Sequence, residues 1–255
     1  MSHQATYYHQ NEAYAEFLAN WDAAFYAKYT DALRPPTPGG RALDVGCGVG
    51  QVIGKLTADG IEAYGVEISE PNLERARTVC PHARLYDGRA LPYPDAWFDT
   101  VGTLNVLEHV EEPEAFLREL VRVVRPGGRL VVSSPNFLRV LGPGYHPRMR
   151  GLAQRWANLK ALFQRRALLK DRTHAVRFER MSPIVREPFQ PDDDAIVVTN
   201  GLEMARALEQ AGCVVERMDC TDRKVPALAE WLLNATPLRW AMFNAFVVAR
   251  RPRSS

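Results

Sequence analysis

Alternating glycines and separated acidic residues carry the clearest chemical signal in the sequence. Gly46, Gly48 and Gly50 follow an apolar run that includes Asp44. Glycine lets the backbone approach a ligand where any Cβ would clash. The N–H groups of such a loop, with the N-terminus of a following helix, offer partial positive charge to a ligand carboxylate. A second apolar run stops on Glu67, where a carboxylate can accept both hydroxyls of a ribose. The spacing therefore predicts a site for a nucleoside-containing ligand.

The elements around this loop follow from hydrophobic periodicity. Residues 41–67 change from strand to helix and back to strand period, which describes one βαβ unit with its tight turn at the carboxyl end of the first strand. Dinucleotide folds require G-x-G-x-x-G, and Gln51 occupies the third glycine position here. A purely structural turn would also explain the loop, so the rest of the chain has to decide.

Composition sets the broad class of the protein. The 255 residues are 46% hydrophobic and 24% charged, which favours one α/β domain with an insertion. A net charge of +2 gives no overall field for nucleic acid. The four cysteines form no C-x-x-C pair and no signal peptide pattern opens the chain, so we expect reduced thiols and a cytoplasmic protein. The sequence contains no apolar run of about 18 residues, so no transmembrane segment is predicted.

Further elements are predicted from periodicity and end signals. Aromatic side chains at helical spacing predict an N-terminal helix that packs on the sheet edge or caps the ligand, with Tyr7 or Tyr8 touching the ligand's carboxylate; the spaced residues are Tyr14, Phe17, Trp21 and Phe25. Helices are expected at 70–79, 113–124 and 201–211, with Ser69 and Asn200 as caps. Strands are expected at 84–86, 98–104, 129–135, 213–220 and 241–250.

Residues 41–136 contain four motifs in unbroken order. They are the G-x-G-x-G loop preceded by Asp44, the acidic Glu67 after the second strand, DGRALPYPDAWFDTV at 87–101, and the block from FDTVGTLNVLEHV to VVSSPN at 98–136. In this order they resemble the class I S-adenosylmethionine (SAM)-dependent methyltransferases, and in detail the UbiG-like and type 11 methyltransferases. The resemblance implies an α/β fold: a doubly wound, seven-stranded, mostly parallel sheet with an antiparallel last strand and a helical lid insertion.

The resemblance also implies a cofactor and a division of the chain. The cofactor is SAM and its product S-adenosyl-L-homocysteine. A single methyltransferase domain would comprise an N-terminal helical cap (1–34), a SAM-binding core (41–136), a lid and substrate insertion (137–200) and the C-terminal part of the sheet (201–255).

Cofactor contacts are carried over from the same resemblance. The loop glycines and Asp44 are expected at the methionine half of SAM, Glu67 at the ribose, and Asp87 and Gly88 at the adenine. The full set of expected contacts is Asp44, Gly46, Cys47, Gly48, Gly50, Glu67, Ile68, Asp87, Gly88, Leu104 and Asn105.

The insertion at 137–200 is expected to select the acceptor, because long connections are usually functional. Residues 148–180 hold ten basic side chains against Asp171 and Glu179, a local charge of +8. Apolar residues at helical spacing predict an amphipathic basic helix: Leu152, Trp156, Leu159, Leu162 and Phe163. This helix is a solvated lid, attracts an anionic substrate, or lies on a lipid surface that carries the acceptor. Asp192, Asp193 and Asp194 pair with the basic face or bind acceptor hydroxyls.

Two histidines are candidates for a general base. His109 follows the fourth strand, and His174 lies in a loop that resembles the family's H-[VL]-R-F segment. A structural hydrogen-bonding role is the alternative for both. UbiG-type enzymes carry E-x-x-E-H after strand four, and here Asn105, Glu108 and His109 stand at those positions. Because a carboxylate is missing, we expect no metal, and a quinone substrate is disfavoured.

The sequence thus predicts a SAM-dependent methyltransferase acting on a small molecule, by O-methylation of a metabolite or of a saccharide or lipid-linked intermediate. The acceptor is expected to be anionic or lipid-linked, with peripheral membrane contact through 148–180 and no nucleic acid partner. N- or C-methylation, a nicotinamide-dependent oxidoreductase and a non-catalytic SAM-binding protein remain as alternatives.

Overall fold

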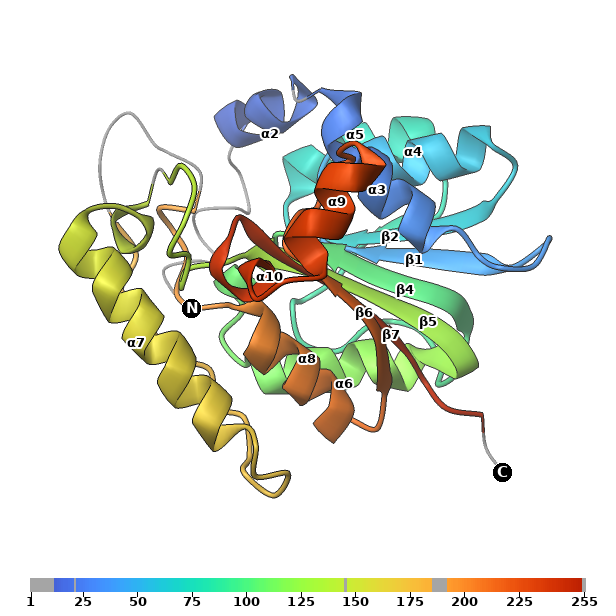
Figure 1. Ribbon diagram of the computed structural model, residues 1–255. Helices are drawn as coiled ribbons and strands as arrows, with labels where there is room; N and C mark the ends of the chain where they lie inside the picture. Colours follow the sequence, from blue (N-terminus) through green and yellow to red (C-terminus); the bar gives the residue numbers. More distant parts are fainter. Residues whose placement is uncertain (1–11, 21, 145, 185–191, 254–255) are drawn as a thin grey trace. The chain divides into compact units, whose positions relative to one another are not determined.

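A seven-stranded sheet forms the frame of the described chain. The computed structural model describes residues 12–20, 22–144, 146–184 and 192–253. Within these residues the strand order is β3-β2-β1-β4-β5-β7-β6 (Figure 1). The strands are Arg41–Val45 (β1), Glu62–Glu67 (β2), Ala83–Leu85 (β3), Phe98–Leu104 (β4), Val124–Pro135 (β5), Val214–Asp219 (β6) and Asn244–Arg250 (β7). β1 pairs in parallel with β2 and β4, and the last strand is antiparallel, which confirms the predicted α/β fold.

The helices include most of the predicted ones and two that were missed. They are Glu12–Ala19 (α2), Ala23–Leu33 (α3), Gln51–Ala58 (α4), Glu70–Val79 (α5), Pro113–Val123 (α6), Leu152–Leu168 (α7), Gly201–Gln210 (α8), Ala227–Asn234 (α9) and Leu238–Ala241 (α10), with 3₁₀ turns at Leu107–His109 (η1) and Pro147–Met149 (η2). α9 and α10 were not predicted.

Asn200 caps α8 as expected, because its side chain accepts from the Glu203 N–H at 3.0 Å. Ser69 stands at the cap position of α5, but its side chain makes no capping hydrogen bond.

Between residues 12 and 33 the structure describes two helices where one was predicted. Asp22 separates them and caps α3, its side chain accepting from the Ala24 N–H at 2.9 Å. Tyr7, Tyr8 and Trp21 lie outside the described residues, as do the side chains of Tyr14 and Phe17.

The chain divides into two compact units. Unit 1 comprises Met1–Leu104, Arg118–Val131 and Arg250–Ser255, and unit 2 comprises Asn105–Leu117 and Val132–Ala249. In unit 1, the buried faces of β1, β2 and β4 contribute Leu43, Val66 and Phe98 to the core. This unit contains the βαβ segment with the glycine loop.

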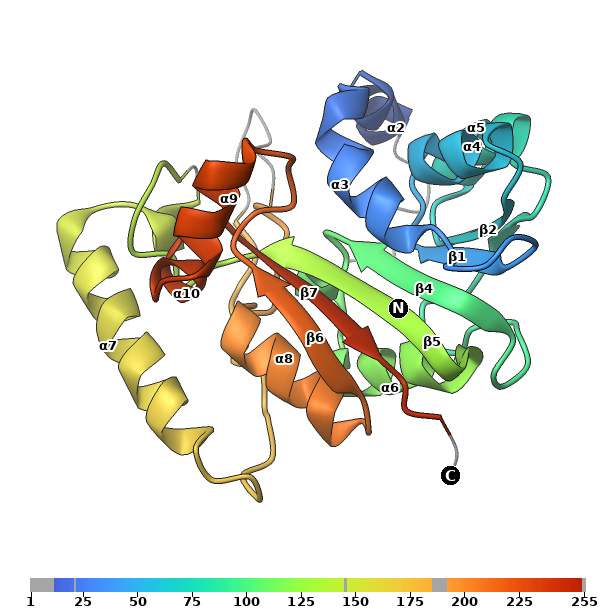
Figure 2. The same cartoon turned by 45° about the vertical axis from the view of Figure 1, so that its right-hand side comes forward.

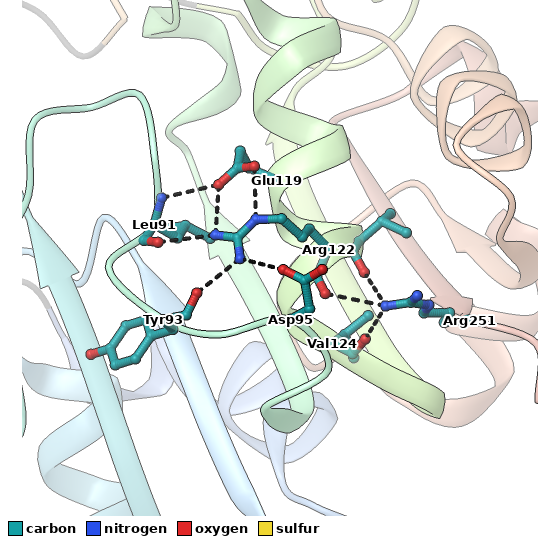
Figure 3. Close-up of polar contacts among 8 residues, drawn as sticks. Leu91, Tyr93, Asp95, Glu119, Arg122, Val124 and Arg251 are labelled. Carbon is teal, nitrogen blue, oxygen red and sulfur yellow. Dashed lines mark hydrogen bonds and ion pairs between the residues drawn. The ribbon is translucent and has the colours of Figure 1, made fainter.

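Arg122, near the end of α6, fastens a loop of unit 1. Its guanidinium donates to Glu119, to Asp95 and to the carbonyls of Leu91 and Tyr93 at 2.8–3.0 Å (Figure 3). The N–H of Leu91 also donates to Glu119, at 3.1 Å. These bonds fix the loop between β3 and β4, which belongs to the DGRALPYPDAWFDTV motif.

β5 begins at Val124, five residues before the predicted start at 129. The Gly127 N–H donates to the Arg251 carbonyl at 2.7 Å, and the Arg251 N–H donates to the Gly128 carbonyl at 3.0 Å. The Arg251 side chain donates to the Val124 carbonyl at 2.7 Å (Figure 3). The R-P-G-G segment is therefore a strand because the C-terminal residues pair with it, although proline and glycine at this place predicted a break.

Unit 2 has a hydrophobic cluster of its own. Its buried members are Phe137, Leu138, Met149, Leu162, Ala195 and Val198. The predicted basic helix is present as α7, which lies beside α8 in both views (Figures 1 and 2). No helix in the described part of the chain is both long and apolar enough to cross a membrane.

Candidate active site

The glycine loop of unit 1 has a backbone that only glycine adopts readily. Gly46, Gly48 and Gly50 have φ angles of +76°, +53° and +89°, in the left-handed region. A Cβ at Gly50 would lie 2.8 Å from the Cα of Ala76 in α5, so the loop also packs too closely for a side chain. A Cβ at Gly48 would lie 3.3 Å from Leu18 of α2. The alternating glycines thus place the loop between two helices.

Four of the five loop amides, those of residues 46, 47, 48 and 50, donate hydrogen bonds within unit 1. The N–H groups of Gly46 and Cys47 donate to the Val66 carbonyl at 2.9 and 3.1 Å, and that of Gly50 donates to the Cys47 carbonyl at 3.0 Å. The Gly48 N–H donates to Oε2 of Glu67 at 2.9 Å. The N-terminus of α4 remains as the source of partial positive charge, because the first amides of a helix have no acceptor within it.

Glu67 holds the loop from the end of β2. Its Oε1 accepts from the N–H groups of Ile68 and Ser69 at 2.8 and 3.0 Å, while Oε2 accepts from Gly48. The residue is buried. Three backbone amides from two segments of unit 1 thus hold the Glu67 carboxylate at the end of β2.

Cys47 points into the sheet. Its sulfur lies where a side chain at Gly65 would stand, 2.7 Å from the Cβ that would be added there. Burial, with the nearby Glu67 and Asp44 charges, raises the pKa of the Cys47 thiol well above its ordinary value. The thiol is therefore neutral at physiological pH and fills space beside the loop.

Asp87 and Gly88 form an exposed turn after β3. The Asp87 carboxylate accepts from the N–H groups of Arg89 and Ala90 at 2.8 and 3.1 Å, and these bonds lower its pKa. Gly88 has φ +77° and a Cβ there would lie 3.7 Å from Ile68. The turn brings Gly88 next to Ile68, the residue that follows Glu67.

Asp44 has a partner that sequence reasoning missed. The hydroxyl of Tyr29 in α3 donates to Oδ1 of Asp44 at 2.7 Å. Both residues are buried, and burial raises the pKa of Asp44 from 3.8 to about 7. Helical spacing of aromatic residues was the available signal, but it did not indicate that Tyr29 points at the acid before the loop.

Leu104 ends β4 in unit 1, and Asn105 opens unit 2. Asn105 has φ +54°, an uncommon conformation for a residue other than glycine. Its N–H donates to the Ser133 carbonyl at 2.9 Å. Its Oδ1 is buried and has no hydrogen-bond donor among the described residues. Strained backbone and an unsatisfied polar atom together are typical of a functional position.

Unit 2 brings an acidic cluster around His109. Glu108 and His109 lie in η1, and the N–H groups of Ile196 and Val197 donate to the Glu108 carbonyl at 2.8 and 3.0 Å. This pairing holds the segment with Asp192 and Asp194 against η1. Nδ1 of His109 is 3.3 Å from Oδ2 of Asp194, and Nε2 is 3.8 Å from Oε1 of Glu108.

Burial controls the charge of this cluster. It lowers the pKa of His109 to about 4 and raises that of Asp194 to about 6. Burial, followed by the charge of Asp192, raises the pKa of Glu108 well above its usual range. Oε2 of Glu108 accepts from Ser134 at 2.8 Å, while Oε1 has no hydrogen-bond donor in the part of the chain that the structure describes. His109 is thus a neutral imidazole at physiological pH.

His174 is not part of this cluster. Its side chain is exposed, and its carbonyl accepts from Gln210 at the end of α8 at 2.6 Å. The Ser134 hydroxyl, which donates to Glu108, also lies 2.8 Å from the Thr199 hydroxyl just before α8. The ten residues of α8 span about 15 Å. The structure therefore separates the two predicted histidines.

The cluster could hold a metal ion with a different ligand set from the one considered in the sequence. Glu108, His109 and Asp192 each offer one ligand atom, all within 4.8 Å of one another. Asp192 takes the place that the motif assigned to Asn105. Sequence reasoning could not bring Asp192 to Glu108, because the two residues are far apart in the chain.

Comparison with known proteins finds a family match for part of the chain. The model of a methyltransferase-domain family matches residues 43–132. The 27-O-demethylrifamycin SV methyltransferase of Amycolatopsis mediterranei (strain S699) is 39% identical over 131 residues, which is 46% of each chain. The 2-methyl-6-phytyl-1,4-hydroquinone methyltransferase of Synechocystis sp. is 38% identical over 105 residues, 39% of this chain and 33% of that protein. The chain spans about half or less of the length of these curated relatives.

A solved structure supports the fold over nearly the whole chain. The SAM-dependent methyltransferase from Mesorhizobium loti is 20% identical, with a TM-score of 0.59 over 89% of this chain and 98% of that chain. Sheet order and family match together define a class I SAM-dependent methyltransferase fold. Within that fold class, residues 43–132 match the model of the methyltransferase-domain family.

Proposed function

We propose that the protein transfers a methyl group from SAM to a small-molecule acceptor, with an oxygen atom as the favoured nucleophile. The observation that best supports this proposal is a hydrogen bond within the matched segment 43–132. The Gly48 N–H donates to Oε2 of Glu67 at 2.9 Å. This bond shapes the corner of the βαβ unit before any ligand arrives. The test is formation of S-adenosylhomocysteine and of a methylated product over an acceptor panel, followed by mass spectrometry.

The residues of unit 1 fit the cofactor. Three left-handed glycines let the loop backbone approach a ligand closely, and Glu67 stands at the end of β2, where a carboxylate can accept from a ribose hydroxyl. When bound, SAM supplies a methyl group on a positively charged sulfur. We assign the methionine half to Asp44, Gly46, Cys47, Gly48 and Gly50, the ribose to Glu67 and Ile68, and the adenine to Asp87 and Gly88. Leu104 and Asn105 complete the proposed contacts.

In unit 2, His109 is proposed as the base that takes the proton from an acceptor hydroxyl. Its imidazole is neutral at physiological pH because burial lowers its pKa. Asp194, 3.3 Å from Nδ1, orients the ring, and Nε2 lies 3.8 Å from Oε1 of Glu108. A positioned base is typically worth about 10²–10⁴-fold in rate. His174 stays a second predicted base, and no metal is assigned to the reaction.

An anionic or lipid-linked acceptor is proposed from the charge of the segment 148–180. Part of that charge is already compensated: Arg148 and Arg165 pair with Glu179 at 2.8 and 2.7 Å. Five basic side chains have no ion pair, hydrogen bond or ring contact among the described residues: Arg150, Lys160, Lys170, Arg172 and Arg177. They attract an anion over a distance set by ionic strength. Comparing acceptors with and without a phosphate group tests this assignment.

The alternatives have their own tests. N- or C-methylation is read from the position of the new methyl group in the product. Calorimetry with NAD and SAM separates a nicotinamide-dependent oxidoreductase from a methyltransferase, since Gln51 replaces the third dinucleotide glycine. SAM binding without turnover over the whole panel would indicate a non-catalytic binding protein.

A further inference from the structure

Helix α7 is anchored to unit 2 through one side only. Nδ2 of Asn158 donates to the carbonyls of Phe137, Arg139 and Arg148 at 3.2, 2.9 and 2.6 Å. Leu162, one turn further along, is buried in the hydrophobic cluster of unit 2. These two residues define the inner face of the helix. Asn158 supplies hydrogen-bond donors to carbonyls of the irregular segment before α7. The inner face of the helix is therefore occupied by contacts within unit 2.

The outer face of α7 is apolar where a solvated helix is expected to be polar. Leu152, Trp156 and Phe163 are 79%, 70% and 64% exposed. They follow one another at intervals of four and seven residues, so their side chains lie in one row along the helix. Single exposed apolar side chains are normal on a protein surface. Three large ones in one row form a contiguous apolar patch, and such a patch indicates a binding partner.

Basic residues border this row, and no acidic residue occurs in α7. Lys160 lies on one side of the row and Arg166 on the other, at the positions that helical geometry gives them. Arg150 precedes the helix and Lys170 follows it. None of Arg150, Lys160 and Lys170 has an ion pair among the described residues, and the Arg166 guanidinium lies 4.3 Å from the ring of Trp240. The face therefore combines apolar side chains with uncompensated positive charge.

We propose that the outer face of α7 docks on an anionic lipid surface. A helix with an aromatic and aliphatic row between Lys and Arg side chains lies in the boundary between headgroups and acyl chains, held by apolar burial and by attraction to anionic lipids. Tryptophan favours that boundary. A second copy of the chain or an acidic protein fits less well, because three side chains burying about 150–250 Å² each fall short of the roughly 800 Å² per partner of a stable interface.

The test is co-sedimentation of the full chain with vesicles, without SAM, so that its outcome is independent of methyl transfer. Vesicles of phosphatidylcholine with phosphatidylglycerol are compared with vesicles of phosphatidylcholine alone. We expect binding to the anionic vesicles only, weakened by salt. Trp156→Ala with Phe163→Ala should reduce it at least tenfold. Lys160→Glu with Arg166→Glu should reduce it similarly, with a smaller salt dependence.

Trp231→Ala in α9 is the matched control. Trp231 is 64% exposed, like Phe163, but its helix contains no basic residue. Its vesicle binding should equal that of the unmodified chain. Calorimetric SAM binding and a thermal unfolding curve check each variant for folding. Absence of binding to anionic vesicles, equal loss in Trp231→Ala, or self-association in solution that Trp156→Ala with Phe163→Ala abolishes would each overturn the proposal.

Discussion

The hydroxyl of Tyr29 donates to Oδ1 of Asp44 at 2.7 Å inside unit 1. This contact depends on Gly102, which lies opposite Asp44 in the register of β1 and β4. A Cβ at Gly102 would lie 2.5 Å from the Tyr29 hydroxyl, so a larger residue there would displace the tyrosine. The acid before the glycine loop is thus held by a helix that precedes it in the chain.

Asp44 makes the stability of the protein depend on pH. Its pKa is raised from 3.8 to about 7, so the folded state holds a proton that the unfolded chain has released between these values. Stability therefore falls as pH rises through this window, by up to about 4 kcal/mol for a pKa difference of this size. Asp44→Asn should make the decline between pH 5 and pH 8 shallower, measured by urea unfolding, while Asp194 and Glu108, whose pKa values are also raised, still contribute to it. Asp59→Asn, whose pKa is lowered by Lys55 and Arg34 at the surface, should leave the decline unchanged. Parallel curves for Asp44→Asn and the unmodified chain would refute the assignment.

Glu67 should control the affinity for SAM. Glu67→Ala removes the acceptor for a ribose hydroxyl and releases the Gly48 amide, so we expect affinity to fall about tenfold or more, given about 1.5–3 kcal/mol for a hydrogen bond to a charged group. Calorimetry measures the change. Glu62→Ala, at the exposed start of the same strand, should keep the original affinity. Unchanged binding in Glu67→Ala would mean that the ribose lies elsewhere.

The βαβ unit and its glycine loop were predictable because their signals are local. Gly46 to Gly50 and the acid at position 67 lie within one short stretch, where alternation and glycine spacing reflect the backbone directly. The family resemblance supplied the seven-stranded, mostly parallel sheet with an antiparallel last strand. The sequence did not reveal that the Val66 carbonyl and the Glu67 side chain accept from the loop amides.

The remaining errors came from contacts between residues far apart in the chain. Arg251 pairs with Gly127 and Gly128, which turns a predicted break into strand. Ile196 and Val197 bond the Glu108 carbonyl, which brings the aspartates of the insertion to η1. Neither pairing could be predicted, because a single sequence shows no hydrophobic period or residue spacing that links segments so far apart.

Replacing His109 and His174 in turn tests which of them acts as the base. His109→Ala should lower kcat/KM by about 10²–10⁴-fold with SAM binding retained, because the imidazole beside Asp194 is lost. His174→Ala should change it by less than about threefold, since the exposed ring lies at the far end of α8 from Glu108. Product formation with a hydroxyl acceptor is the readout, and Asp194→Asn, which keeps a side chain beside Nδ1, serves as the intermediate variant. The reverse ranking of the two histidine variants would move the base to His174.

Removal of divalent ions should leave the reaction unchanged. Glu108, His109 and Asp192 could supply three ligand atoms, whereas Mg²⁺ requires about six in near-octahedral geometry. Glu108 is fully buried and one of its oxygens already accepts from Ser134, which limits the room for the water ligands that would complete the shell. Activity in EDTA should therefore equal activity in Mg²⁺, and Asp192→Asn should not create a metal requirement. Loss of turnover in EDTA that is restored by Mg²⁺ or Mn²⁺ would instead identify this cluster as a metal centre. The proposal that His109 accepts the proton would then be wrong.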